Sequence, residues 1–321
     1  MGKISNRFAA AMKSVPDAEL VAVASRDQAK SDAFAAKYGA MSAYSNYSDL
    51  IQDKNVDVIY VGLINSLHYE ITRQCLEQHK PVLCEKPLVT TQKEAQELIA
   101  LAQNHNTLLM EAMWTRCMPA FRQARTWLRE GRIGEAKLIT ANFSYLGTYD
   151  PHNRQYNADL EGGSLFDVGI YPIDFAIGLL EEHPTEVTGL AKISPSRVDE
   201  LASFSMSFNS GILASLNSGF TVNAKREAVI YGTRGRIVVE NCYGPQWCDR
   251  FDENDLLVEH FEEPVPDGFV YQIQHCIDLL GNGQIESNLI PWKDTLAAAK
   301  IYDDLYGQWG LRQIAEQSTE E

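Results

Sequence analysis

The chain has 321 residues, of which 45% are hydrophobic and 22% are charged, so it is long enough to fold into two domains that each bury a core. Acidic residues outnumber basic residues by 43 to 28, and the resulting formal net charge of -15 argues against nucleic acid or an anionic membrane surface as a partner. No apolar stretch approaches the roughly 20 residues of a membrane span, and residues 1–12 lack the apolar segment of a secretory signal.

Six cysteines are scattered along the chain, at positions 75, 84, 117, 242, 248 and 276. None has CxxC spacing, and the seven histidines show neither H-x-H nor H-x-x-x-H spacing, which argues against a metal-dependent hydrolase. The pattern predicts reduced, mostly buried thiols in a cytoplasmic protein that has no metal site.

The first third of the chain alternates short apolar runs with helical stretches, as in a parallel sheet built from right-handed βαβ units. Strands are expected at residues 20–25, 56–61, 81–84 and 107–111, and helices at 6–14, 28–38, 67–79 and 91–105. Asp27 is the predicted cap of the second helix, and Gly39 is its predicted stop.

The pattern changes at about residue 117, where alternating strands become frequent. Strands are expected at 137–145, 185–193, 200–208, 211–219, 226–231 and 235–240, and helices at 119–130, 164–181, 268–281 and 291–310. We therefore predict a Rossmann-type parallel-sheet domain for dinucleotide binding over 1–117 and an α+β domain with an open, mostly antiparallel sheet over 118–321. The second domain would bind substrate and dimerise, with its last helix packing back on the first domain. The polar tail, 317–321, is expected to be frayed.

The start of the chain lacks most of a dinucleotide-binding fingerprint, which is an apolar strand, G-x-G-x-x-G and a helix. Gly2 matches the second glycine of that fingerprint or is an ordinary flexible start. The absent strand would be central in the sheet order 3-2-1-4-5-6, and about five buried side chains worth roughly 1.5–3 kcal/mol each would go with it. We expect a start truncated by roughly ten residues, with a rearranged sheet as the alternative, and impaired cofactor binding by the chain as given.

Ser25 and Arg26 end the strand after which NAD-preferring folds place an acidic residue. A hydroxyl and a guanidinium suit a 2′-phosphate, because arginine binds phosphate in a bidentate way. These residues favour NADP over NAD, although Arg26 would also be compatible with a solvated surface position.

Polar residues follow the next two strands, at the edge of a parallel sheet where ligands bind. Asn65 and His68 follow the strand at 56–61, and Lys86 follows the strand at 81–84. Asn65 and His68 are also compatible with a helix cap and a first-turn histidine.

Asp167 and Tyr171 are four residues apart and would share one face of a helix. A tyrosine with a pKa near 10 is a poor base at neutral pH, but a nearby ammonium group such as that of Lys86 would stabilise the phenolate. We interpret Lys86, Asp167 and Tyr171 as a set that moves a proton to or from a hydroxyl group while a nicotinamide exchanges hydride. The alternative is a helix-terminal aspartate and a half-buried structural tyrosine.

At these residues the sequence resembles the glucose–fructose oxidoreductase / inositol dehydrogenase (Gfo/Idh/MocA) family over nearly its whole length. The motifs that match are Glu85-Lys86-Pro87, Asn65-x-x-His68, residues 111–116 and residues 162–169. The resemblance implies that Lys86 is catalytic, that Asn65 and His68 lie near the nicotinamide, and that Glu85, Trp114 and Arg116 belong to the cofactor site.

Tyr171 stands where many members have histidine, and this is similar to the subgroup of dimeric dihydrodiol dehydrogenase and NADP-dependent xylose dehydrogenase. Ile64 stands where the family often has proline, a change expected to affect only the stiffness of its loop. The resemblance implies a homodimer formed through the open face of the antiparallel sheet.

These observations predict an NADP-dependent oxidoreductase that acts on a secondary alcohol or ketone of a sugar or cyclic diol. Arg154 precedes the catalytic helix and is either a substrate contact or a surface arginine. The rival interpretation is a non-enzymatic relative of the fold that senses a sugar or nucleotide, which fits the absent strand but not the intact catalytic set.

Overall fold

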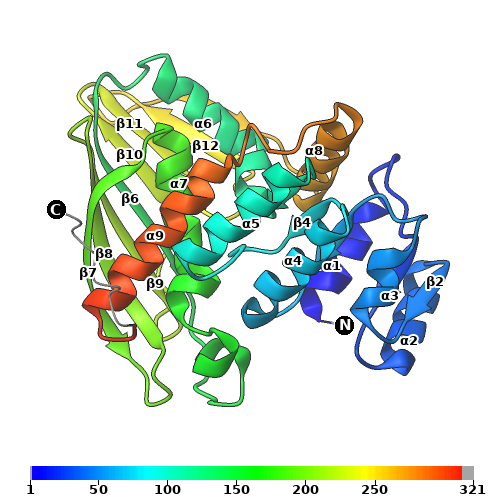
Figure 1. The fold of residues 1–321 in the computed structure, drawn as a ribbon. Coiled ribbons are helices and arrows are strands. Elements are labelled where there is room, and N and C mark those ends of the chain that lie inside the picture. Colours follow the sequence, from blue (N-terminus) through cyan, green and yellow to red (C-terminus); the bar gives the residue numbers. More distant parts are fainter. Residues whose placement is uncertain (1, 313–321) are drawn as a thin grey trace. The chain divides into compact units, whose positions relative to one another are not determined.

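The computed structural model describes residues 2–312, so Met1 and the predicted frayed tail lie outside the described residues. The chain divides into two compact units (Figure 1). The first unit comprises Met1–Val89, Lys93–Met118 and Pro264–Thr295, and the second comprises Thr90–Gln92, Pro119–Glu263 and Leu296–Glu321. The first unit thus includes a late segment of the chain as well as its beginning.

The parallel strands of the first unit form two sheets instead of one. β1 (Ala22–Ala24) pairs with β2 (Ser42–Tyr44), a strand that was not predicted. β3 (Ile59–Val61), β4 (Val82–Cys84) and β5 (Leu109–Glu111) form the second sheet in that order. The expected parallel βαβ pattern is confirmed, but the sheet is interrupted between β1 and β3.

The burial of the strands reflects this interruption. β4 has paired neighbours on both sides, and all of its residues are buried. In β1 only Val23 is buried, while Ala22 and Ala24 are half-buried. The sequence predicted a buried strand here. β1 is less buried than predicted because it is paired with a strand on one side only.

Helices of the first unit follow the predicted ranges with small shifts. They are α1 (Lys3–Met12), α2 (Gln28–Tyr38), α3 (Tyr47–Gln52, not predicted), α4 (His68–Glu77), α5 (Gln92–Asn104) and α8 (Phe269–Gly281). Asp27 caps α2 by accepting a hydrogen bond from the Lys30 N–H, and Gly39 ends it in the left-handed conformation, as expected.

The late segment of the first unit covers the outer edge of β5. The Leu109 N–H donates to the Ile285 carbonyl at 3.1 Å, and the Trp292 indole donates to the Leu109 carbonyl at 2.8 Å. Arg116 and Asp294 form an ion pair at 3.0 Å, with side chains only 2% and 5% exposed.

The second unit contains one sheet of eight strands in the order β13-β12-β11-β10-β6-β9-β8-β7. Its strands are β6 (Ala136–Ser144), β7 (Pro184–Ile193), β8 (Asp199–Phe208), β9 (Leu213–Gly219), β10 (Ala228–Gly232), β11 (Gly235–Val239), β12 (Trp247–Phe251) and β13 (Leu257–Glu262). Every neighbouring pair is antiparallel except β6 and β9, which confirms the predicted sheet. β12 and β13 were not predicted, because polar and charged residues interrupt their apolar pattern.

Helices α6 (Pro119–Arg129) and α7 (Ile170–Leu180) lie against this sheet, α6 on β11 to β13 and α7 on β6 and β9 (Figure 1). α9 (Trp292–Gln308) closes the described chain. The stretch Ala158–Leu180 is long and apolar enough to cross a membrane, but 89% of its most apolar window is buried inside the protein. It therefore has the burial of a core helix.

Candidate active site

Lys86 lies on the loop that follows β4, the central strand of its sheet. Its side chain is half-buried, and the Lys86–Pro87 peptide bond is cis. Because the loop leaves the carboxyl end of a parallel strand, it occupies the position at which such sheets bind ligands.

Neighbouring side chains hold the backbone of this loop. The Nδ1 atom of His68 lies 2.8 Å from the Pro87 carbonyl oxygen, and its Nε2 atom lies 3.2 Å from the Leu63 carbonyl oxygen. The Leu88 N–H donates to Glu111 at 2.9 Å. His68 is 1% exposed, so in the structure it ties two loops together inside the first unit.

Glu85 is buried beside Lys86 and accepts a hydrogen bond from the Tyr60 hydroxyl at 2.6 Å. The Tyr60 ring is stacked on Phe8 with 3.6 Å between ring centroids. Burial raises the pKa of Glu85, whereas its bond to Tyr60 opposes that change. Tyr60 is a supporting residue that the sequence analysis missed, since an aromatic residue within a strand looks like ordinary core.

The start of α1 has the features of an anion site. Gly2 is the N-cap residue, supplies no side-chain cap, and has open space where a Cβ would stand. The first turn contains Lys3 and no acidic residue. Unsatisfied N–H groups at a helix start attract phosphate, so this turn fits the pyrophosphate of a dinucleotide.

The end of β1 presents an exposed guanidinium next to a hydroxyl group. The Arg26 side chain is exposed, and the Ser25 hydroxyl contacts the backbone of Asp27 at 3.0 Å. Hydrogen bonding from the Lys30 N–H lowers the pKa of Asp27, which serves as the cap of α2. The nearby carboxylate therefore has a structural role, and Arg26 is the residue that can bind phosphate.

The other predicted cofactor residues lie in the same unit. Asn65 begins a 3₁₀ turn (Asn65–Leu67) directly before α4. The Trp114 ring packs edge-on against Phe269, with ring centroids 5.3 Å apart. Arg116 is committed to its buried pair with Asp294, a role that the motif alone did not reveal.

The catalytic helix of the second unit starts with a π-helical turn, Leu165–Gly169, which leads into α7. Pro172 has no N–H to donate to the Val168 carbonyl four residues earlier, and its ring crowds that carbonyl in an α-helix. The wider turn accommodates this, and such turns are frequent at functional sites. The predicted helix at 164–181 is present, but its first turn is not α-helical.

Gly162 and Gly163 are required by close packing. A Cβ on Gly162 would lie 2.5 Å from the Arg154 carbonyl oxygen, and one on Gly163 would lie 2.4 Å from the Asp199 carboxylate. Gly163 also has φ +122°, a conformation that other residues rarely adopt.

Asp167 is bound by donors from the preceding segment. The Arg154 guanidinium lies 2.9 Å from its Oδ1 atom, and the Gln155 amide lies 2.7 Å from its Oδ2 atom. The Tyr145 hydroxyl lies 3.4 Å from Oδ2. Arg154, predicted as a substrate contact or a surface residue, forms an ion pair with Asp167.

Tyr171 is 8% exposed and belongs to an aromatic group. Its ring centroid is 5.4 Å from that of Phe143 and 6.1 Å from that of Tyr243. Phe143 and Tyr243 are themselves stacked at 4.5 Å. The Tyr171 ring is therefore packed among neighbouring aromatic rings.

Asp199, at the start of β8, anchors the beginning of the catalytic helix. It accepts hydrogen bonds from the Ser164 hydroxyl at 2.6 Å, the Leu165 N–H at 2.7 Å and the Tyr306 hydroxyl at 2.8 Å. Full burial raises its pKa to about 6. The sequence analysis did not identify Asp199. The only signal for it was an acidic residue at an otherwise apolar strand.

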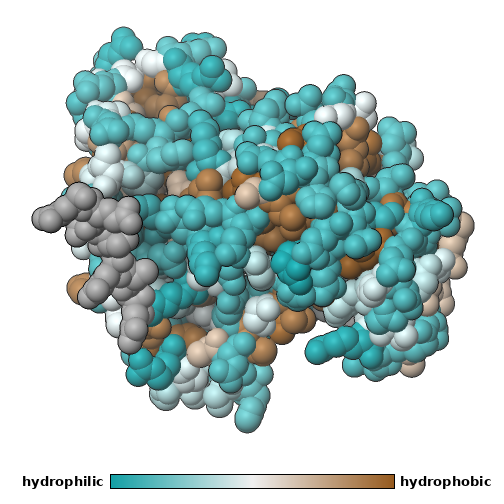
Figure 2. All heavy atoms as spheres, viewed as in Figure 1, coloured by the Kyte–Doolittle hydropathy of each residue, from teal (hydrophilic) through white to brown (hydrophobic). Residues whose placement is uncertain are grey.

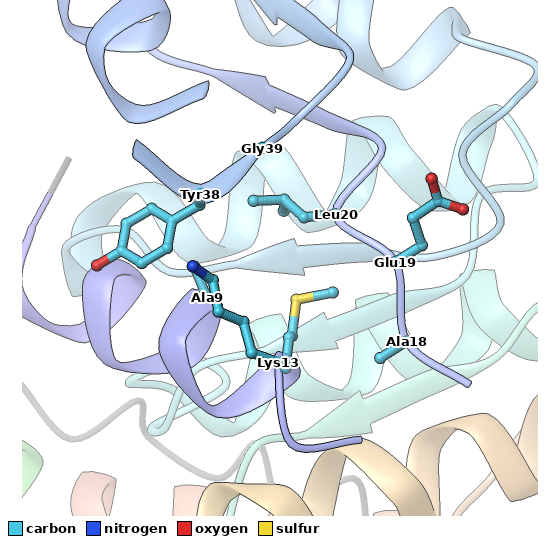
Figure 3. Close-up of a pocket in the computed structure, with 8 residues that line it drawn as sticks. Ala9, Lys13, Ala18, Glu19, Leu20, Tyr38 and Gly39 are labelled. Carbon is cyan, nitrogen blue, oxygen red and sulfur yellow. The ribbon is translucent and has the colours of Figure 1, made fainter. Parts of the chain in front are cut away.

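A pocket of about 190 Å³ lies in the first unit, lined by Lys13, Glu19, Leu20, Tyr38 and neighbours (Figure 3). Residues 18–20 precede β1, so the pocket lies at the amino end of that strand. Arg26 follows the opposite, carboxyl end, and the pocket is therefore separate from the predicted cofactor residues. Among residues 2–312, no group of three or more His, Cys, Asp or Glu side chains is arranged to hold a metal ion.

The parallel βαβ pattern of the first unit, with a half-buried lysine after its central strand, is typical of dinucleotide-dependent oxidoreductases. Residues 1–113 match the oxidoreductase family with an NAD-binding Rossmann fold, and residues 121–238 match the GFO/IDH/MocA C-terminal domain. The chain belongs to the Gfo/Idh/MocA family, which confirms the resemblance seen in its motifs. It is an oxidoreductase of the kind that acts on CH–OH groups.

Relatives span nearly the whole chain. Trans-1,2-dihydrobenzene-1,2-diol dehydrogenase from Xenopus tropicalis is 33% identical over 322 residues, covering 97% of this chain and 96% of the relative. The human enzyme of the same name is 30% identical, covering 95% and 93%. KijD10, a 3-ketoreductase from Actinomadura kijaniata solved with TDP-benzene and NADP, is 27% identical with a TM-score of 0.82, covering 95% and 94%.

Proposed function

We propose that this protein is an NADP-dependent oxidoreductase that exchanges hydride with a secondary alcohol or ketone of a sugar or cyclic diol. The observation that carries the proposal is the half-buried Lys86 on the loop after the central parallel strand β4, in a chain that also holds Asp167 and the buried Tyr171 at the start of one helix. Dehydrogenation of a diol by the relatives and NADP in KijD10 support the substrate class and the cofactor.

Each proposed catalytic residue has a chemical task. Tyr171 holds the proton that the substrate oxygen gains or loses, since its hydroxyl is the acid and base of the set. Lys86 supplies a positive charge that stabilises the phenolate and the developing alkoxide. Asp167 orients the substrate hydroxyl by hydrogen bonding.

The cofactor would be held by the first unit. Gly2 and the start of α1 would bind its pyrophosphate, Ser25 and Arg26 its 2′-phosphate, and Asn65 the nicotinamide end. When bound, the nicotinamide supplies or accepts the hydride. His68 and Glu85 would contribute by holding the Lys86 loop in place, as their contacts with Pro87 and Tyr60 indicate.

The test is a titration of NADPH followed by protein fluorescence, on the chain as given and on a version with an apolar strand and G-x-G turn joined ahead of α1. We expect tight binding by the extended chain, weaker binding of NADH, and turnover of D-xylose or trans-cyclohexane-1,2-diol. Failure of both chains to bind NADPH would overturn the proposal.

We also propose a homodimer formed through the open face of the eight-stranded sheet. Tyr231, Leu138 and Leu213 are paired neighbours across β10, β6 and β9, and Tyr231 and Leu213 are 40% and 54% exposed. The helix-covered side of the molecule, which Figure 2 shows, is by comparison largely hydrophilic, with separate apolar areas. Leu213→Glu should convert a dimer into monomers in analytical ultracentrifugation, and an unchanged mass would contradict this interface.

The six cysteines are buried and none is in a disulfide bond, which supports a reducing, cytoplasmic location. Burial raises the pKa of Cys75, Cys242, Cys248 and Cys276 to about 12, so these thiols are inert at neutral pH.

A further inference from the structure

The contacts of Asp167 extend beyond the residues that the motifs identify. Gln155 donates to Asp167 and also contacts the Tyr145 hydroxyl. The Tyr145 hydroxyl lies 3.4 Å from the same carboxylate oxygen, and Arg154 binds the other oxygen at 2.9 Å. Both oxygens of Asp167 are therefore bound by side chains of the segment between β6 and the catalytic helix.

Tyr145 is held from the sheet side. Its N–H donates to the Gly219 carbonyl at 3.0 Å, and its ring lies 5.4 Å from that of Phe220. Burial, reinforced by the negative charge of Asp167, raises the pKa of Tyr145. Its hydroxyl therefore stays protonated at neutral pH and can donate to the carboxylate.

Gln155 is held from the helix side. Its carbonyl accepts from the Gly163 N–H at 2.9 Å, and Gly162 approaches so closely that a Cβ would lie 2.7 Å from that carbonyl. The segment 147–161 is thus attached to the start of the helix in two ways. Its backbone contacts Gly162 and Gly163, and its side chains bind Asp167.

We propose that Tyr145 and Gln155 are positioning residues that fix the Asp167 carboxylate and, with Arg154, fasten the segment 147–161 for substrate binding. This inference rests on the proposed function of Asp167. It also assigns Asp167 an orienting role, because its two oxygens are already engaged by donors and the proton transfer remains with Tyr171. Charge-assisted hydrogen bonds of this kind are stronger than neutral ones, so their loss should be measurable.

The test compares Tyr145→Phe, Gln155→Leu and Gln155→Glu in the NADPH-binding form of the full chain, with Tyr149→Phe as a matched control on an exposed tyrosine of the same segment. Hydrogen exchange should accelerate in residues 147–161 in the three variants and not in the control. With D-xylose and trans-cyclohexane-1,2-diol, kcat/KM should fall about ten- to a hundredfold while NADPH affinity is unchanged. Gln155→Glu should show the largest loss, because it places a second negative charge beside Asp167.

Exchange and kcat/KM equal to those of Tyr149→Phe would overturn the inference while leaving the proposed function intact. A second outcome is also possible: exchange in residues 147–161 accelerates in the Tyr145 and Gln155 variants, but the unsubstituted protein turns over no substrate. That result would support the attachment of the segment and would count against the proposed function.

Discussion

Both units of this chain contain a β-sheet and helices, but their strands differ in how continuously they are paired. In the second unit eight strands form one uninterrupted ladder, and its inward side chains, such as Ile139, Phe204 and Leu216, are buried. In the first unit five strands form two sheets, and β1 and β3 each lack a paired neighbour on one side. Pairing on both edges stabilises a strand, so β1 and β3, which are each paired on one edge only, have less support than β4.

The largest expected effect comes from closing the first sheet. An apolar strand of about five residues joined ahead of α1 should pair with both β1 and β3, since the Ser5 hydroxyl at the start of α1 lies 3.3 Å from the Gly62 carbonyl at the end of β3. The gain in unfolding free energy should be about 5 kcal/mol or more, from roughly 1.5–3 kcal/mol per buried side chain less the entropy of ordering. Denaturation with hydrogen exchange should show β1 and β3 becoming as protected as β4. A glycine–serine extension of equal length is the control, and equal protection in both versions would contradict the prediction.

The division of chemistry between the units can be tested by removing one group from each. Lys86→Met in the first unit and Tyr171→Phe in the second should each lower kcat about 10²- to 10⁴-fold, because each removes a member of the proton-transfer set. NADPH affinity should change little in Tyr171→Phe. Steady-state kinetics measure kcat on whichever chain, as given or extended, binds NADPH in the titration. Lys93→Met, at an exposed lysine, is the control. Near-normal kcat in either variant would remove that residue from the catalytic set.

The buried ion pair belongs to the first unit alone. Asp294→Asn should lower the unfolding free energy by about 3–5 kcal/mol, because it removes the negative charge that pairs with the buried Arg116 guanidinium. Hydrogen exchange should locate the loss in β5 and in residues 264–295, with β6 to β9 unaffected. Asp278→Asn, on the exposed side of α8, should have no such effect, and uniform loss across both units would contradict the assignment.

The smallest effect concerns the pH dependence of the second unit. Because the pKa of Asp199 is raised to about 6 from the ordinary 3.8, the folded state holds this proton more tightly than the unfolded chain. The protonated Asp199 carboxyl therefore stabilises the folded state fully below about pH 4, and this stabilisation is lost as the pH rises through 6. Asp199→Asn should therefore gain about 3 kcal/mol relative to wild type between pH 4 and 7, on top of a constant cost from the altered hydrogen bonds. Chemical denaturation at several pH values measures this, with Asp17→Asn as control; a constant difference would contradict it.

Much of the fold followed from local patterns. Asp27 and Gly39 correctly marked the ends of α2, and the alternation of apolar residues located six of the eight strands of the second sheet. β12 and its neighbour β13, the edge strand, were not predicted because polar and charged residues interrupt their apolar pattern, as in Leu257–Glu262. The roles of Lys86, Asp167 and Tyr171 were inferred from spacing and resemblance. They remain predictions, and Lys86→Met and Tyr171→Phe test two of them.

By itself the sequence determined the family, the class of fold and the local position of each motif residue, because these depend on short-range periodicity and on residue types at fixed spacing. Only the tertiary structure decided the partners of those residues: that Arg154 binds Asp167, that Arg116 is committed to Asp294, and that Asp199 anchors the catalytic helix. These partners are 13, 178 and 34 residues apart in the chain. Hydrogen bonds and ion pairs act over a few ångströms of space, so their partners become known only when the chain is folded.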